Sequence, residues 1–253
     1  MKKYLLLTLF ATLIFTACNS KIDFTIDPPK PVIYNSDLLI SETSTAINTS
    51  SGTRPHYVEL YNGTNTSVNL ADYAIGYISV TDLTTLTTWS FPTNNFLILS
   101  NTLAAEKCYV IASPQSDPLI IKSDITWGTT STASASAGLP LQLSGNSAIA
   151  LLKKDLSGTF TLNGTKYKII DVFGSPLVAR VQCQGTVSVR NNMMWTIAGE
   201  VNDTRNRTFF RKATVIKPTL DWEKAKGTSA VDSEWIISGD KAWDFTNIGL
   251  PTQ

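Results

Sequence analysis

The sequence predicts an all-β fold, either a sandwich or a barrel, and three observations lead to this prediction. From Leu38 onward, short apolar runs alternate with turn-forming residues. Asn-Gly pairs separate some of these runs, and both residue types tolerate the positive φ angles that tight hairpin turns require. No long stretch keeps the apolar period of an amphipathic helix. The chain should therefore consist mostly of strands, with little helix.

The expected strands share short apolar or alternating runs bounded by turn residues. They are residues 38–42, 57–61, 73–80, 86–91, 96–99, 108–112, 147–152, 167–173, 208–211 and 234–237. Within them, residues 149–152 are apolar at every position, which predicts a strand covered on both faces. Val58 and Leu60 should point to the face opposite that of Glu59, because side chains alternate along a strand.

Turn chemistry completes the strand prediction. Asn163-Gly164 lies between residues 159–162 and 165–169 and predicts a hairpin with a type I′ turn. Residues 129–138 form a loop of small residues, and residues 175–192 could form an added hairpin. The best helix candidate is residues 220–225, a turn or two.

The N-terminus has the pattern of an export signal. Lys2 and Lys3 precede an apolar run over residues 5–15, which is too short for a membrane span of about 20 residues. Thr16-Ala17-Cys18 follows and resembles a bacterial lipobox. We therefore expect residues 1–17 to be a lipoprotein signal peptide and Cys18 to be lipidated. The alternative is an ordinary cleaved signal with a chance cysteine.

The residues after the signal predict where the protein resides. Residues 18–36 are polar and proline-rich and read as a tether. Asn19 is not the aspartate associated with inner-membrane retention, so the lipobox resemblance implies the bacterial outer membrane, facing the periplasm or the cell surface. The membrane, reached through the lipid anchor, is the first expected partner.

Charge and cysteine content narrow the class of protein further. The chain has 21 basic and 20 acidic residues, and loss of Lys2 and Lys3 leaves 19 basic residues in the mature chain. This balance argues against bulk electrostatic binding to nucleic acid or anionic lipid. With Cys18 lipidated, Cys108 and Cys183 remain, and they form either a disulfide in an oxidising compartment or two free thiols.

Motifs in a fixed order along residues 38–250 carry a family resemblance. They are Leu39-Ile40-Ser41-Glu42, Tyr57-Val58-Glu59-Leu60-Tyr61-Asn62, Val68 to Tyr73, Cys108 to Ala112, Gly145 to Leu152, Ile170-Asp171-Val172-Phe173-Gly174, Arg207 to Lys212, Glu234-Trp235 and Asp244 to Gly249. Together they resemble the bacterial form of the lamin-tail domain family. The resemblance implies an immunoglobulin-like β-sandwich over residues 37–253, with inserted loops or hairpins.

The sequence offers little material for catalysis. His56 is the single histidine, which excludes histidine-rich metal sites, and at the start of a strand we expect it to be exposed or at an edge. No phosphate-binding glycine loop, nucleophile elbow or calcium loop occurs. We therefore expect no enzyme activity, no metal and no cofactor. Trp195 and Trp235 should be core residues, and Asp171 should bond a turn or a nearby basic residue.

Three functions remain from different classes. The first is a non-catalytic binding or interaction module on the envelope, with a protein, glycan or DNA ligand. The second is an accessory DNA-binding or nuclease-associated protein, because lamin-tail domains occur in such proteins; the basic residues Arg205, Arg207, Arg211 and Lys212 would contact phosphates, although a charged edge strand explains them as well. The third is an enzyme with an unrecognised pair of carboxylates.

Overall fold

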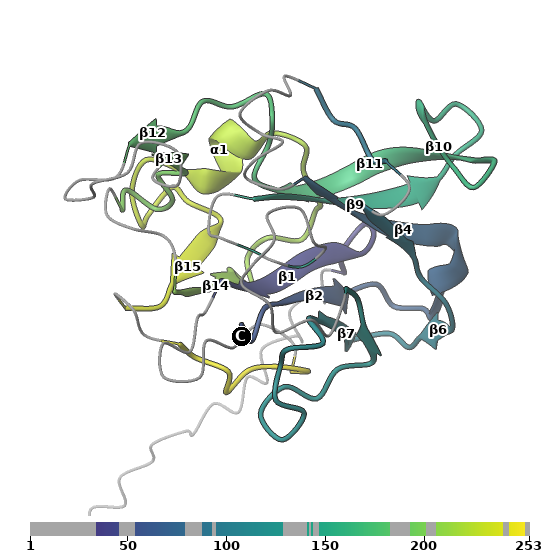
Figure 1. Ribbon diagram of the computed structural model, residues 1–253, viewed down its shortest axis with the longest axis horizontal. Helices are drawn as coiled ribbons and strands as arrows, with labels where there is room; N and C mark the ends of the chain where they lie inside the picture. Colours follow the sequence, from purple (N-terminus) through teal and green to yellow (C-terminus); the bar gives the residue numbers. More distant parts are fainter. Residues whose placement is uncertain are drawn as a thin grey trace, which may run out of the picture. The chain divides into compact units, whose positions relative to one another are not determined.

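Two β-sheets stacked face to face form the body of the computed structural model (Figure 1). The structure describes residues 34–45, 54–78, 88–92, 95–128, 141, 143, 147–182, 193–200, 206–239 and 243–250. All of them belong to one compact unit, Ile33–Gln253. The signal peptide, most of the tether and the loop 129–138 lie outside the described residues.

The larger sheet has six strands, of which only the last pair is parallel. Their order is β15 (Trp235–Ile237), β14 (Thr208–Arg211), β1 (Leu39–Ser44), β2 (Tyr57–Asn62), β7 (Lys107–Ala112) and β8 (Ile125–Thr126). Two strands from the end of the chain, β14 and β15, thus extend the sheet beside the first strand. Among the described strands, β15 forms one end of this sheet.

The smaller sheet has five antiparallel strands. Their order is β10 (Phe160–Leu162), β11 (Thr165–Phe173), β9 (Ala148–Lys154), β4 (Tyr73–Ile78) and β5 (Phe96–Ile98). The turn between β10 and β11 has positive φ at both central residues, 47° at Asn163 and 79° at Gly164. This confirms the predicted hairpin, because a type I′ turn requires both angles.

The hydrophobic core lies between the two sheets, as the alternation of side chains predicts. Val58 and Leu60 on β2 point into it, and residues 148–152 on β9 are buried at every position. The opposite face of the larger sheet is covered as well. There Tyr57 and Val110 form a second cluster with Phe245 and Ile248 of the C-terminal segment.

The remaining elements are short. The pairs β3 (Val68–Asn69) with β6 (Thr102–Leu103) and β12 (Val181–Gln182) with β13 (Met193–Met194) form two-stranded ribbons, and η1 is a 3-10 turn, Leu70–Asp72. The β12–β13 pair is the predicted added hairpin, with its second strand just beyond residue 192. The helix α1 (Trp222–Lys226) begins after Asp221, whose side chain accepts a hydrogen bond from the Lys224 N–H at 3.0 Å, as an N-cap does.

One expected strand is wrong in its described part. Residues 88–91 form no strand, and residues 86–87 lie outside the described residues. Trp89 and Phe91 pack their rings against the core, and Phe91 lies against Gly76 and 5.2 Å from the Phe160 ring. The apolar run therefore serves as a cover for the smaller sheet rather than as a strand. In the described part of the chain, no helix is long and apolar enough to cross a membrane.

Candidate functional site

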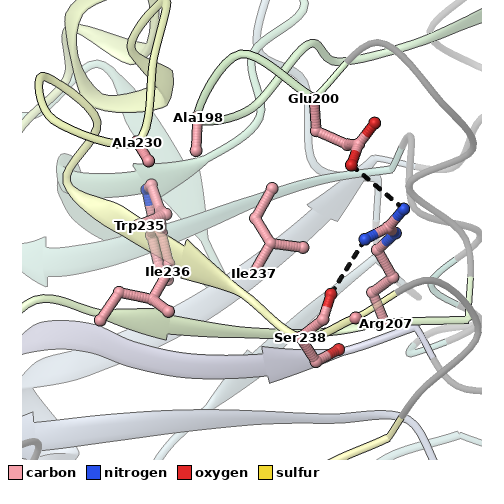
Figure 2. A pocket seen from close by; sticks show the side chains of 9 residues that line it. Ala198, Glu200, Arg207, Ala230, Trp235, Ile236, Ile237 and Ser238 are labelled. Atoms are coloured by element: carbon pink, nitrogen blue, oxygen red, sulfur yellow. Dashed lines mark hydrogen bonds and ion pairs between the residues drawn. The ribbon is translucent and has the colours of Figure 1, made fainter.

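A pocket of about 420 Å³ lies against β15, at the end of the larger sheet (Figure 2). Its described lining residues come from the segment 198–200, from the residue just before β14, from the loop at residue 230, and from β15 with the residues that follow it. They are Ala198, Glu200, Arg207, Ala230, Trp235, Ile236, Ile237, Ser238 and Gly239. This volume is within the range of small-ligand sites, which is roughly 300–1,000 Å³.

One side of the pocket is polar. The Arg207 guanidinium is 3.4 Å from a Glu200 carboxylate oxygen and donates a 2.9 Å hydrogen bond to the Ser238 carbonyl (Figure 2). The Arg207 side chain is only 4% exposed, whereas that of Glu200 is 28% exposed. Within this ion pair, the Glu200 carboxylate is therefore the group more exposed to solvent.

The other side of the pocket is apolar and rigid. Trp235 is fully buried and belongs to an aromatic cluster in which its ring centroid lies 5.0 Å from that of Phe173 and 6.4 Å from that of Trp222. The Arg211 guanidinium lies 4.9 Å from the Trp235 ring centre, a cation–π arrangement. These contacts on several sides hold the indole in place against the pocket.

The Trp235 indole N–H has no hydrogen-bond partner in the described part of the chain. Figure 2 shows its nitrogen on the side of the ring nearest Ala230. A buried donor without a partner costs free energy, about 1–3 kcal/mol. The pocket thus combines an apolar wall with one ion pair, a pattern typical of binding sites.

The described residues contain no group of three or more histidine, cysteine, aspartate or glutamate side chains placed to hold a metal. Among the described residues that line the pocket, Glu200 is the one with a carboxylate. A glycosidase-type mechanism needs two carboxylates facing each other across the substrate. The described lining of the pocket therefore offers contacts for binding and does not include that pair.

Two buried carboxylates lie elsewhere, on the face of the larger sheet beneath residues 243–250. Glu42 of β1 is paired directly with Glu59 of β2, and each is 1% exposed. The Tyr57 hydroxyl donates a short hydrogen bond to Glu42. The Ser41 hydroxyl and the Gly249 N–H donate to the two oxygens of Glu59, each at 2.7 Å.

These surroundings favour the neutral acid. Burial, together with the charges of Glu59 and Asp244, raises the pKa of Glu42 to about 8, although the Tyr57 hydrogen bond opposes this rise. Burial also raises the pKa of Glu59, against the hydrogen bonds from Ser41 and Gly249. At neutral pH Glu42 is therefore mostly protonated, which avoids two negative charges side by side.

Asp171 is at the centre of a third buried group. It accepts hydrogen bonds from the N–H groups of Ile40 and Thr219, both at 2.8 Å, and lies 3.1 Å from the Arg211 guanidinium. Arg211 also pairs with Glu234 at 2.5 Å. The prediction was that Asp171 bonds a turn or a nearby basic residue, and the Arg211 ion pair confirms the basic partner. The two backbone donors come from distant parts of the chain, so Asp171 ties β11 to β1 and β14.

The predicted phosphate contacts do not hold for Arg207 and Arg211. Both are buried, since β14 lies between β15 and β1, and Arg211 turns inward to Asp171. For the same reason β14 is not a charged edge strand. The Lys212 ammonium donates to the carbonyls of Ala230 and Val231, at 2.7 and 3.1 Å. Arg205 lies outside the described residues.

Of the three cysteines, the structure describes Cys108. Cys18 and Cys183 lie outside the described residues, so lipidation and the Cys108–Cys183 disulfide stay predictions. Cys108 is a free cysteine in this structure. Burial, followed by the nearby Glu59 charge, raises the pKa of its thiol well above the usual value. A thiol held in its protonated form is a poor nucleophile.

His56 is not exposed or at an edge, as the sequence predicted. It is fully buried on the approach to β2, and the Leu143 N–H donates to its Nδ1 at 2.8 Å. The Leu143 backbone therefore comes from far along the chain to satisfy the imidazole, which a local pattern does not reveal. Trp195 and Trp235 are core residues, as predicted, and Trp235 lines the pocket as well.

Sequence reasoning missed the pocket. Glu200 and Ala198 belong to no recognisable motif, and Arg207 was assigned to a surface. One signal was available, because Glu234-Trp235 is a short run in which the first residue bonds to β14 and the second lines the pocket. The loop contacts that close the pocket depend on tertiary structure.

The two stacked sheets and the pocket at the end of the larger one define the class of this protein, an immunoglobulin-like β-sandwich with a pocket beside one sheet. The family model described as Lamin Tail Domain matches residues 32–175. The chain belongs to this family. All residues that line the pocket follow the matched segment.

Two further comparisons add little. A crystal structure of a DUF4876 family protein from Bacteroides thetaiotaomicron is similar, with a TM-score of 0.42 and 12% sequence identity over 87% of this chain and 73% of that chain. No curated protein matches the chain in sequence.

Proposed function

We propose that this chain is a lipid-anchored envelope protein whose lamin-tail domain acts as a non-catalytic binding module, with the pocket beside β15 as its binding site. The observation that carries the proposal is the pocket itself. It joins an apolar wall that includes Trp235 and Ile237 to the Glu200–Arg207 ion pair. The lipobox-like Thr16-Ala17-Cys18 supports the anchor.

The non-catalytic role rests on what the pocket presents. Among the described lining residues, the one carboxylate is that of Glu200, which is engaged by Arg207, and Arg207 is itself almost fully buried. The same described residues include no cysteine, serine–histidine pair or second acid. Such a lining can hold a ligand by shape and hydrogen bonds.

Binding is tested with the full chain in detergent against arrays of peptides, glycans and DNA. Ala230→Trp places an indole at the mouth of the pocket, because Ala230 is exposed and lines it. Leu156→Trp is the matched control, at a site that is 94% exposed and does not line the pocket. We expect a ligand that loses binding to the first variant and keeps it with the second. Equal binding to both variants would refute the assigned site.

Anchoring is tested separately by labelling cells with a radioactive fatty acid. The full chain should carry the label in the membrane fraction, and Cys18→Ser should lose it. Label that persists in Cys18→Ser, or no label on the full chain, would rule out the lipid anchor at this cysteine.

A further inference from the structure

Among the described strands, β15 pairs on one side alone, with β14, and its other edge lies along the same pocket. The Lys212 N–H donates to the Glu234 carbonyl at 2.8 Å, and the Ser238 N–H donates to the Thr208 carbonyl at 2.9 Å. In an antiparallel ladder, hydrogen-bonded pairs alternate with pairs whose backbone groups point away. Ile236 therefore bonds to β14, whereas the backbone groups of Trp235 and Ile237 point away from it.

Ile237 presents the outward backbone groups that are accessible, since this residue is partly exposed. The Trp235 N–H is taken by the Ser233 hydroxyl at 3.0 Å, and Trp235 is fully buried, so its carbonyl does not face solvent. The Ile237 N–H and the Ile237 carbonyl have no partner among the described residues. One extended residue of an added strand can bond both of these groups.

The pocket runs along this same edge. Its lining contains every residue from Trp235 to Gly239. Consecutive strand residues point to opposite faces, so a cavity that touches all of them must contact the strand from its side. In Figure 2 the Ile237 side chain lies between Trp235 and the Glu200–Arg207 pair.

We propose that the edge of β15 binds an extended peptide, which adds a strand to the six-stranded sheet and inserts an apolar side chain into the pocket. This inference rests on the proposed function, because it names the ligand class of that site. The residue opposite Ile237 would share its face, and its side chain would meet Ala198, Trp235 and Ile237. The partly exposed Glu200 carboxylate favours a basic residue nearby in the peptide.

A random peptide library displayed on phage is selected on the full chain in detergent, with Ala230→Trp as the counter-selection. We expect enriched peptides to share one apolar position beside a basic one. The failure to enrich any peptide over the counter-selection would overturn the peptide proposal. If glycans or DNA still bind in the arrays and depend on Ala230, the binding module stands without it.

Strand addition is tested through the backbone. Ile237→Pro removes an N–H that β14 does not use, and proline is tolerated at sheet edges. We expect Ile237→Pro to weaken the binding of an enriched peptide about tenfold, because one hydrogen bond is lost and the adjacent one is disturbed. Ile236→Pro is the control for folding, since it removes an N–H of the β14 ladder and should lower the melting temperature far more than Ile237→Pro.

A second test of strand addition changes the peptide and leaves the protein as it is. N-methylation of the enriched peptide, one position at a time, should abolish binding only at alternating residues, because alternate N–H groups of an added strand face β15. Loss of binding at no position, or at consecutive positions, would overturn strand addition while leaving the pocket as a binding site. Self-association of the chain that Ile237→Pro abolishes, without peptide binding, would instead identify a second copy as the occupant.

Discussion

Asp171 shows how one buried residue can hold several strands of this sandwich together. It is fully buried, and it accepts bonds from the N–H groups of Ile40 and Thr219 while facing Arg211. A carboxylate taken from water is tolerated only when it is paired and hydrogen-bonded in this way. The contribution of Asp171 to the stability of the fold therefore depends on its ion pair with Arg211 more than on the apolar packing around it.

Removal of the Arg211 charge should be severely destabilising. We expect Arg211→Met to lower the free energy of unfolding by about 3–5 kcal/mol, because Asp171 would stay buried without its partner. Urea denaturation measures this change. Lys212→Met is the control, since its ammonium contacts only exposed carbonyls and should cost about 1 kcal/mol or less. Similar losses in both variants would contradict the account.

The Glu42–Glu59 pair predicts a dependence of stability on pH. The pKa of Glu42 is about 8 in the folded protein against a reference value of 4.5, so the folded state holds a proton that the unfolded state releases. Its stabilising contribution is complete below about pH 4.5 and is lost as the pH rises toward 8. The loss should reach several kcal/mol, because each pKa unit corresponds to about 1.4 kcal/mol.

Denaturation of the wild type and of the variant Glu42→Gln at several pH values tests this dependence directly. Glu42→Gln keeps an acceptor for the Tyr57 hydroxyl and removes the titration, so its unfolding free energy should fall much less between about pH 5 and pH 8. Glu106→Gln, at an exposed position, should follow the wild-type curve. A Glu42→Gln curve as steep as that of the wild type would show that another group governs the decline.

At the scale of elements, residues 243–250 act as a cover for one face of the larger sheet. Phe245 packs against the Tyr57 ring with centroids 6.0 Å apart, the Asp244 N–H donates to Thr208 at 3.1 Å, and Gly249 bonds Glu59. These contacts are few, so this segment should open more readily than the strands below it.

Phe245→Ala should loosen this cover without unfolding the sandwich. The lost ring contact should cost about 1–2 kcal/mol, because Phe245 is only partly buried. Hydrogen exchange at the Gly249 amide should become faster, while exchange in β2 stays slow. Leu156→Ala, at a site that is 94% exposed and outside this segment, is the control. Unchanged exchange at Gly249 in the Phe245 variant would contradict the covering role.

The element scale also shows which parts of the fold local patterns can predict. The hairpin at Asn163-Gly164 and the doubly covered strand β9 were predictable, because a turn type and an unbroken apolar run are both local properties. The two-residue strands such as β3 and β8 were not, since so few residues carry no period. Residues 88–91 have strand-like composition, yet their rings are used as a cover.

The candidate site was less predictable for a physical reason. Arg207 and Arg211 look like surface charges in the sequence, and only the insertion of β14 between two strands buries them. The pocket needs Ala198 and Ala230 to meet β15, which are contacts between distant loops. Trp235 was correctly expected in the core, but its place at the edge of that core depends on where the sheet ends.

At the scale of the whole molecule, the family match and the described lining of the pocket fall on different parts of the chain. The match to the lamin-tail family covers residues 32–175, which supply both sheets apart from β14 and β15. The later residues supply those two strands, α1 and the whole lining of the pocket. We therefore expect ligand specificity to reside in the portion after residue 175.

The most direct test of this account is hydrogen–deuterium exchange of the full chain with and without a ligand recovered from the binding arrays. Bound ligand should slow exchange at residues 234–239 and 198–200, where the pocket lines β15. Slower exchange confined to the five-stranded sheet or to residues 243–250, with none at β15, would show that the ligand binds elsewhere and that the pocket is not the functional site.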